Sequence, residues 1–149
     1  DHKLIGQVSA GDLLKKYQPD DGIGSAIEKV LTINAEERVV HLRRRMLDDN
    51  ITRFVVTENE KYAGIVTETD VAIALRKFRE AVDGNHQDHR IRYLIVRDIM
   101  SAPLISVEKT AAAADVIATM LKKNISAIPV MEKGKLAGIV TRHSLVKAL

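Results

Sequence analysis

The chain has 149 residues, of which 46% are hydrophobic and 29% are charged, enough apolar surface for a compact fold. It contains no cysteine, which excludes disulfides, thiolate nucleophiles and cysteine-ligated zinc. Aromatic residues make up only 3%, so neither an aromatic cage nor a base-stacking platform is expected. The 20 acidic residues are interleaved with 23 basic ones, and a net charge of +3 gives little support to nucleic-acid binding.

The apolar runs are short. None approaches the roughly 20 residues that a membrane-spanning helix needs, and no signal-peptide pattern opens the chain. We therefore expect a cytoplasmic protein. The first residue is Asp1 rather than Met, which leaves open that the native start lies upstream. The basic run Arg43–Arg45 is followed by Asp48 and Asp49, and this mixture favours a solvated helix face over a phosphate-binding patch.

The first recognisable segment is K-L-I-G-Q-V-S-A-G-D-L-L, which begins at Lys3. It matches K-L-A-G-I-V-T-R-H-S-L-V, which begins at Lys135, and places Gly6, Ser9 and Asp12 at the same spacing as the glycine, hydroxyl and third polar residue there. Two interpretations stay open for residues 1–22. They are the tail of a preceding repeat, or they are a lead-in segment of the first repeat.

The remainder of the chain is a tandem repeat, because a shift of 74 residues aligns 24–75 with 98–149 without a gap. Fourteen aligned positions are identical, all within 46–75 and 120–149. Each copy begins with a β-branched strand, K-V-L-T-I ending at Ile33 and P-L-I-S-V ending at Val107.

A helix follows each of these strands. In the second copy Thr110 is the predicted cap of a helix whose apolar residues recur at helical spacing, namely Val116, Ile117, Met120 and Leu121. Asn50 and Asn124 stand where left-handed helix stops are expected. Two further strands then meet at polar turns, Glu58–Lys61 in the first copy and Glu132–Lys135 in the second, and a second helix closes each copy.

A copy as short as 24–75 or 98–149 is too small to bury both faces of its sheet. The two copies are therefore expected to pack together as a pseudo-two-fold pair. The connector between them, residues 78–95, continues the second helix and is expected to break at Gly84. Its His86, Asp88 and His89 lack a third ligand on a rigid element, which favours a polar connector over a metal site.

The order strand, helix, strand, strand, helix with a terminal G-h-h-[S/T]-x-x-[D/N] motif resembles the cystathionine-beta-synthase (CBS) domain family. Pro129 in the I-P-V strand and the segment V-R-D-I-M from Val96 are also typical of that family. The resemblance implies an α/β (α+β) fold, a tandem CBS domain pair of two β-α-β-β-α repeats packed sheet to sheet. The repeats occupy residues 23–77 and 96–149.

The resemblance also implies a ligand site in the first copy, G-I-V-T-E-T-D from Gly64. In the family the hydroxyl at the position of Thr67 meets a phosphate, and the carboxylate at the position of Asp70 takes the ribose hydroxyls. The N–H groups and the dipole at a helix N-terminus stabilise a bound anion. A carboxylate can accept two hydrogen bonds from a vicinal diol. The alternative is that Thr67 and Asp70 only cap the following helix.

The second copy, G-I-V-T-R-H-S, keeps Thr141 but has Ser144 where the family has a carboxylate. We therefore expect this second site to be weaker or empty, with Arg142 and His143 as additional cationic donors. The resemblance makes the sites composite. It joins Thr67 and Asp70 to the backbone of Leu104, Ile105 and Ser106, and it joins Thr141 and Ser144 to Val30, Leu31 and Thr32.

Arg53 lies directly before the F-V-V strand, where nucleotide-sensing members of the family carry a phosphate-contacting arginine, and its counterpart in the second copy is Ala127. An arginine that leads into a buried strand needs a partner for its charge. Phosphate is one candidate partner and a carboxylate of the protein is the other.

Together these features predict a non-catalytic regulatory module that binds AMP, ADP, ATP or S-adenosylmethionine. The chain has no G-x-S-x-G elbow, P-loop or Rossmann glycine motif, so no enzyme activity and no cofactor or metal are expected. The alternatives are a ligand-free scaffold that mediates dimerisation and a nucleic-acid-binding module. A homodimer and a regulated partner or flanking domain are also expected.

Overall fold

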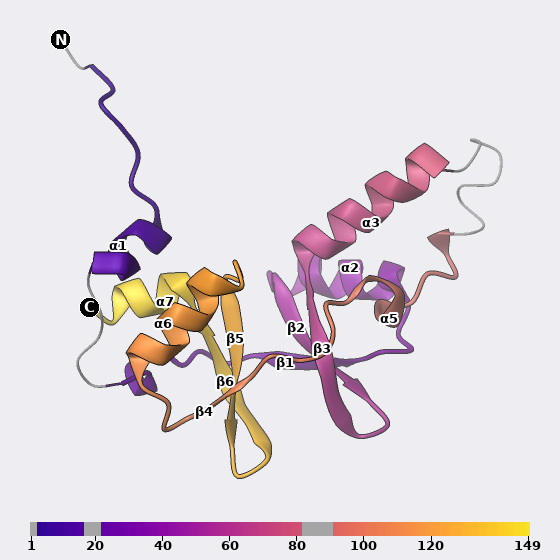
Figure 1. The fold of residues 1–149 in the computed structure, drawn as a ribbon. Coiled ribbons are helices and arrows are strands. Elements are labelled where there is room, and N and C mark those ends of the chain that lie inside the picture. The colour runs from indigo at the N-terminus through magenta and orange to yellow at the C-terminus, as the bar shows by residue number, and fades with distance from the viewer. Residues whose placement is uncertain (1–2, 17–21, 82–90) are drawn as a thin grey trace. The chain divides into compact units, whose positions relative to one another are not determined.

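The computed structural model describes residues 3–16, 22–81 and 91–149. The chain divides into two compact units that do not follow the repeat boundaries. The central unit consists of Val30–Ile105, and the terminal unit combines Asp1–Lys29 with Ser106–Leu149. Each unit contains one three-stranded sheet with helices (Figure 1). This is the mixed α+β architecture that the sequence predicts.

The central unit is built around the sheet of the first repeat. Strand β1 runs parallel to β2, and β2 pairs with β3 in antiparallel fashion. In chain order its elements are β1 (Leu31–Asn34), α2 (Val39–Asp48), β2 (Arg53–Glu58), β3 (Lys61–Thr67), α3 (Glu68–Ala81) and α5 (Val96–Ile99).

The terminal unit repeats the same topology, with sheet order β4-β5-β6. It adds a helix from the front of the chain, α1, which contacts α6 and α7. Its elements are α1 (Ala10–Lys16), the 3-10 helix η1 (Gly24–Ala26), β4 (Val107–Glu108), α6 (Ala113–Lys122), β5 (Ala127–Glu132), β6 (Lys135–Thr141) and α7 (Arg142–Lys147).

Local backbone geometry explains where the helices stop and the strands turn. Asn50 and Asn124, directly after the first helix of each repeat, have φ of 53° and 51°, which confirms the predicted left-handed stops. The β2–β3 turn places Asn59 and Glu60 at positive φ, and the β5–β6 turn does the same with its two central residues. Two consecutive positive-φ residues match the twist of the flanking strands, so both pairs close as tight hairpins.

Each sheet buries one face against its helices. In the central unit Phe54, Val56 and Val66 are completely buried together with Leu42 of α2. In the terminal unit the corresponding layer is formed by Ile128, Val130, Val140 and Leu145. These positions alternate along each strand, so the intervening side chains project from the opposite face of the sheet.

The segment that leads into each repeat pairs with the sheet of the other repeat. Glu28 forms an antiparallel bridge with Ile139 of β6, with N–O distances of 2.8 and 2.9 Å. Ser101 forms the equivalent bridge with Ile65 of β3, at 2.9 and 3.0 Å. This reciprocal exchange explains why the units do not follow the repeat boundaries.

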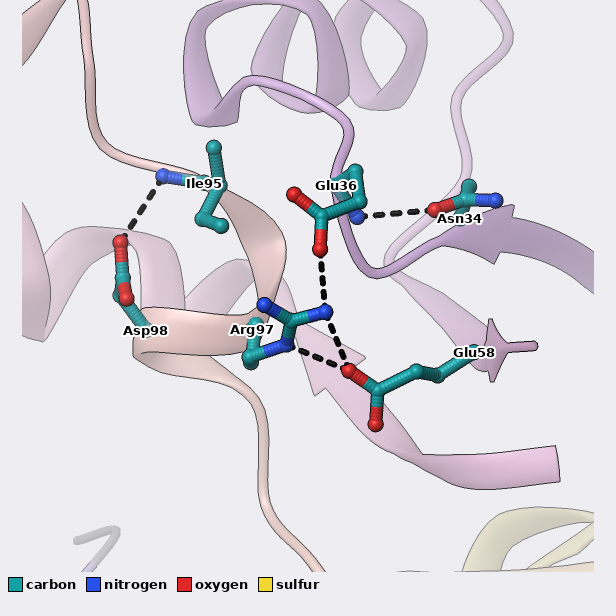
Figure 2. Close-up of polar contacts among 6 residues, drawn as sticks. All are labelled: Asn34, Glu36, Glu58, Ile95, Arg97 and Asp98. Atoms are coloured by element: carbon teal, nitrogen blue, oxygen red, sulfur yellow. Dashed lines mark hydrogen bonds and ion pairs between the residues drawn. The ribbon is translucent and has the colours of Figure 1, made fainter. Parts of the chain in front are cut away.

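Arg97 anchors the lead-in helix α5 in the central unit (Figure 2). Its guanidinium forms ion pairs with Glu36, which lies between β1 and α2, and with Glu58 at the end of β2. The hydrogen bond that Arg97 donates to the Glu58 carboxylate is the main reason that the pKa of Arg97 is raised. In the same helix the Asp98 carboxylate accepts a hydrogen bond from the backbone N–H of Ile95 at 3.1 Å.

Three local predictions need correction. The strand predicted to end at Ile33 is present but begins only at Leu31, and the one predicted to end at Val107 is reduced to β4, Val107 and Glu108. Strand β1 starts late because Glu28, ahead of it, pairs with β6 of the second repeat. The strand predicted to end at Val107 starts late because Pro103, its first residue, has no N–H to donate to a neighbouring strand. Thr110 is not the cap of α6, which begins after Ala112 without a side-chain cap hydrogen bond.

Candidate functional site

Thr67 and Asp70 form a hydrogen-bonded pair where β3 passes into α3. The Asp70 Oδ2 atom accepts from the Thr67 backbone N–H at 2.8 Å and from its hydroxyl at 2.7 Å. The Thr67 hydroxyl oxygen in turn accepts from the Asp70 N–H at 3.3 Å. The capping role is therefore present. Within the described residues no hydrogen bond occupies Asp70 Oδ1, so one carboxylate oxygen is available to a further donor.

Arg53 lies directly opposite Thr67 in the β2–β3 register. Directly opposed residues in an antiparallel pair project from the same sheet face, and this face is opposite the one that carries Phe54 and Val66. Within the described part of the chain, the Nη1 atom of Arg53 is buried and has no hydrogen-bond partner. Such a guanidinium nitrogen, on the residue in register with Thr67, together with the remaining oxygen of Asp70, is suited to an anionic, hydroxyl-bearing ligand.

The remaining residues predicted for this site are divided between the two units. Leu104 and Ile105 are half-buried, lie outside any strand and belong to the central unit with Thr67. Ser106 is the first residue of the terminal unit's second segment. The proposed contact of this stretch with a base stays a prediction.

The second motif also forms a capping box, but its members are buried. Thr141 and Ser144 are 8% and 4% exposed. The Ser144 Oγ atom accepts from the Thr141 N–H at 2.9 Å and donates to the Thr141 carbonyl at 3.1 Å, while the Thr141 hydroxyl accepts from the Ser144 N–H at 2.9 Å. The single hydroxyl of Ser144 is thus used within the motif, whereas Asp70 retains a second oxygen.

Arg142 has a role that the sequence did not indicate. Its Nε and Nη2 atoms donate to the carbonyls of Ile125 and Met120, at 3.0 and 3.1 Å, and so hold the end of α6. The neighbouring His143 is exposed. The other residues assigned to this second site belong to the central unit, and their pairing with Thr141 stays a prediction: Val30, Leu31 and Thr32.

The same motif geometry occurs a third time, at the front of the chain. Asp12 Oδ2 accepts from the Ser9 N–H at 3.1 Å and from the Ser9 hydroxyl at 2.6 Å. The Ser9 hydroxyl oxygen accepts from the Asp12 N–H at 3.2 Å. These hydrogen bonds are the main reason that the pKa of the Asp12 carboxyl is lowered. The sequence match between residues 3–14 and the two later motifs therefore extends to their hydrogen bonds.

The sequence motif did not reveal why its glycine is needed. A Cβ atom on Gly64 would lie 2.5 Å from the carbonyl oxygen of Ser101, and one on Gly138 would lie 2.5 Å from that of Glu28. The glycine thus admits the exchanged lead-in segment at the edge of each sheet. Its occurrence at the same position in both copies was the available signal.

The model of the CBS domain family matches residues 23–77 and 96–149. The chain belongs to the CBS domain family. Protein MJ1404 of Methanocaldococcus jannaschii is 31% identical over an alignment 155 residues long, which covers 97% of this chain but only 37% of that protein. The chain thus spans little more than a third of that relative.

Solved structures that share the CBS fold include the following two. Protein MJ1225 of Methanocaldococcus jannaschii has a TM-score of 0.76 at 24% identity, and the match covers 97% of this chain and 55% of that one. The CBS domain pair of protein MJ0100, solved in complex with 5-methylthioadenosine and S-adenosyl-L-methionine, has a TM-score of 0.68 at 22% identity, with 87% and 95% covered. At these identities the likeness concerns the fold.

Neither a metal-binding cluster nor a membrane-spanning helix is found in the described parts of the chain. Residues 3–16, 22–81 and 91–149 contain no group of three or more histidine, aspartate or glutamate side chains arranged to hold a metal. No helix within those ranges is long and apolar enough to cross a membrane. His86, Asp88 and His89, interpreted above as part of a polar connector, lie outside the described residues, as does Gly84.

Proposed function

We propose that this CBS pair is a non-catalytic regulatory module that binds an adenine nucleotide (AMP, ADP or ATP) or S-adenosylmethionine at the site built on Thr67 and Asp70. The observation that carries the proposal is the buried Nη1 atom of Arg53, a residue opposite Thr67, which has no hydrogen-bond partner among the residues that the structure describes. Burial of an unpaired charge is costly, so such a group is retained where a ligand completes its hydrogen bonds.

In this proposal each group has a separate task. Arg53 takes a phosphate, and the Thr67 hydroxyl joins it by turning its proton from Asp70 Oδ2 to the anion. The free Oδ1 of Asp70 accepts from the ribose diol. Arginine is well suited to phosphate because its planar donors match the anion's oxygens. A phosphorylated adenosine is therefore favoured over S-adenosylmethionine. The MJ0100 complex supports the adenosyl class, since a pair of the same fold is solved with two such compounds.

A thermal-shift series with AMP, ADP, ATP and S-adenosylmethionine at millimolar concentration tests the proposal. Ligand at 100 times its dissociation constant adds about 2.7 kcal/mol of stability, which for a chain of this size raises the Tm by roughly 5–10 °C. The Asp70→Ala variant should lose this shift. Asp115→Ala, which removes an exposed acid from the first turn of α6, is the matched control and should keep it.

If none of the four compounds moves the Tm, the ligand-free scaffold becomes the better interpretation. Polynucleotide binding is separated by salt, because its affinity falls steeply between 50 and 200 mM salt, by about 10³-fold or more for six or more phosphate contacts. A nucleotide bound through one or two phosphates should weaken only mildly over that range.

A further inference from the structure

Lys3–Val8 is an extended segment whose apolar side chains are uncovered. Leu4, Ile5 and Val8 are 90%, 98% and 70% exposed. The segment is followed by the Ser9–Asp12 capping box and by α1. Three large apolar residues within six positions of exposed chain are unusual for a soluble surface, because each loses the stabilisation that burial would give.

The two later copies of this sequence show what covers such a segment. Val8 aligns with Val66 of β3 and Val140 of β6, and both counterparts are 0% exposed. Each of those strands is paired along its length with the strand that precedes it through a tight turn, β2 in one case and β5 in the other. Each is then followed directly by a helix, as Lys3–Val8 is followed by α1.

The glycine of the motif supports the same comparison. At Gly64 and Gly138 a neighbouring backbone carbonyl would lie 2.5 Å from an added Cβ atom. An added Cβ atom on the aligned Gly6 would meet no atom of the described residues within 4 Å beyond its chain neighbours. Gly6 thus keeps the residue type that a close backbone neighbour demands, in a place where the structure shows no neighbour. The open space beside Gly6 is a second sign that a neighbouring strand is missing, independent of the exposed apolar side chains.

We propose that Lys3–Lys16 is the last strand and closing helix of a third CBS repeat, and that Lys3–Val8 is covered by the strand that immediately precedes it in a longer form of this chain. The covering strand pairs in antiparallel fashion through a tight turn, as β2 and β5 do with their partners. The length of MJ1404, of which this chain spans 37%, leaves room for such a repeat.

Helix α1 already holds this fragment in place. Its Leu14 is 1% exposed and belongs to the core of the terminal unit, and α1 contacts both α6 and α7. Gly11 of α1 also lies against α7, since an added Cβ atom there would be in van der Waals contact with the Nη1 atom of Arg142 at 3.5 Å. The third repeat would therefore be docked on the terminal unit through its closing helix.

The test compares the 149-residue chain with the same chain extended upstream to its natural start. Amide hydrogen exchange of Lys3–Val8 should be at least about tenfold slower in the extended chain, because the amides enter a ladder. Val8→Ser should lower the Tm of the extended chain by about 5 °C or more and leave that of the 149-residue chain unchanged. Lys3→Ser is the matched control, since the aligned Lys61 and Lys135 are exposed in their strands.

Three outcomes would overturn the proposal. One is a gene with no coding sequence ahead of Asp1. Another is equally fast exchange of Lys3–Val8 in both chains. The third is slow exchange in the 149-residue chain that appears only at high protein concentration, which would assign the strand to a second copy instead. Ligand binding at Thr67 is not involved in any of them.

Discussion

At the scale of single residues, the two motifs differ in one side chain with a clear chemical consequence. Asp70 uses one carboxylate oxygen to hold Thr67 and keeps the other, whereas Ser144 uses its only oxygen within the motif. The sequence predicted unequal sites from the identity of these residues. The hydrogen bonds give the inequality a physical basis, because only the first motif retains an acceptor for a ribose.

The first prediction is that Asp70→Ala abolishes the high-affinity phase of nucleotide binding in calorimetry, while Ser144→Asp strengthens or creates a weak phase. Loss of a charge-assisted acceptor costs about 1.5–3 kcal/mol, or roughly ten- to hundredfold in affinity. The gain of binding is the sharper half of the test. Binding that survives Asp70→Ala but is lost in Thr141→Val would reverse the ranking of the two sites.

The second prediction concerns Arg53, for which stability and binding should change in opposite directions. Arg53→Met removes a buried nitrogen that has no partner among the described residues, so the ligand-free protein should be more stable by about 1 kcal/mol. Its affinity for AMP should fall about tenfold, while that for unphosphorylated adenosine stays the same. Denaturation without ligand and calorimetry with both compounds measure this. A destabilised variant with unchanged AMP affinity would show that Arg53 serves the fold.

At the scale of elements, each sheet is completed by the segment that leads into the other repeat. Each lead-in segment occupies the outer edge of the opposite repeat's sheet, through Glu28 in the terminal unit and Ser101 in the central unit. An unpaired sheet edge exposes a row of N–H and C=O groups, and these bridges cover part of it. The Arg97 ion pairs strengthen the second of these attachments (Figure 2).

We therefore predict that Gly64→Ala and Gly138→Ala each destabilise the fold by about 1–3 kcal/mol, since the added methyl group meets a backbone carbonyl that has little freedom to move. Gly24→Ala is the control and should be close to neutral, because no atom of the described residues beyond its chain neighbours lies within 4 Å of its added Cβ. Chemical denaturation compares the three variants. A Gly64→Ala protein as stable as the control would mean that the lead-in segment is loosely held.

At the scale of the whole molecule, we predict a homodimer that uses the helices around Val39–Leu47 and Ala111–Leu121. The α2 helix exposes Leu47 at 67% and Val40 at 37%, and apolar side chains on a helix face favour association. Light scattering at tens of micromolar should give the mass of a dimer, and Leu47→Glu should give that of a monomer. Leu149→Glu, which alters an exposed leucine at the chain end, is the control. A monomeric mass for the unaltered protein would count against the prediction.

The sequence by itself determined the features that depend on neighbours along the chain. The repeat register, the helix stops at Asn50 and Asn124, the two hairpins and the paired Thr67 and Asp70 all follow from local spacing and residue type. Such features need only residues a few positions apart, so a single sequence contains the information.

The tertiary structure alone decided which sheet each lead-in segment joins. The strand predicted to end at Ile33 starts late, after Glu28 has paired with the opposite repeat's sheet. The strand predicted to end at Val107 starts later still, because Ser101 pairs in the same way and Pro103 has no N–H for a ladder. A β-branched run shows that a strand is favourable but does not identify its partner, because pairing depends on groups far away in the sequence. The same holds for Arg142, whose partners Ile125 and Met120 are brought to it only by the fold.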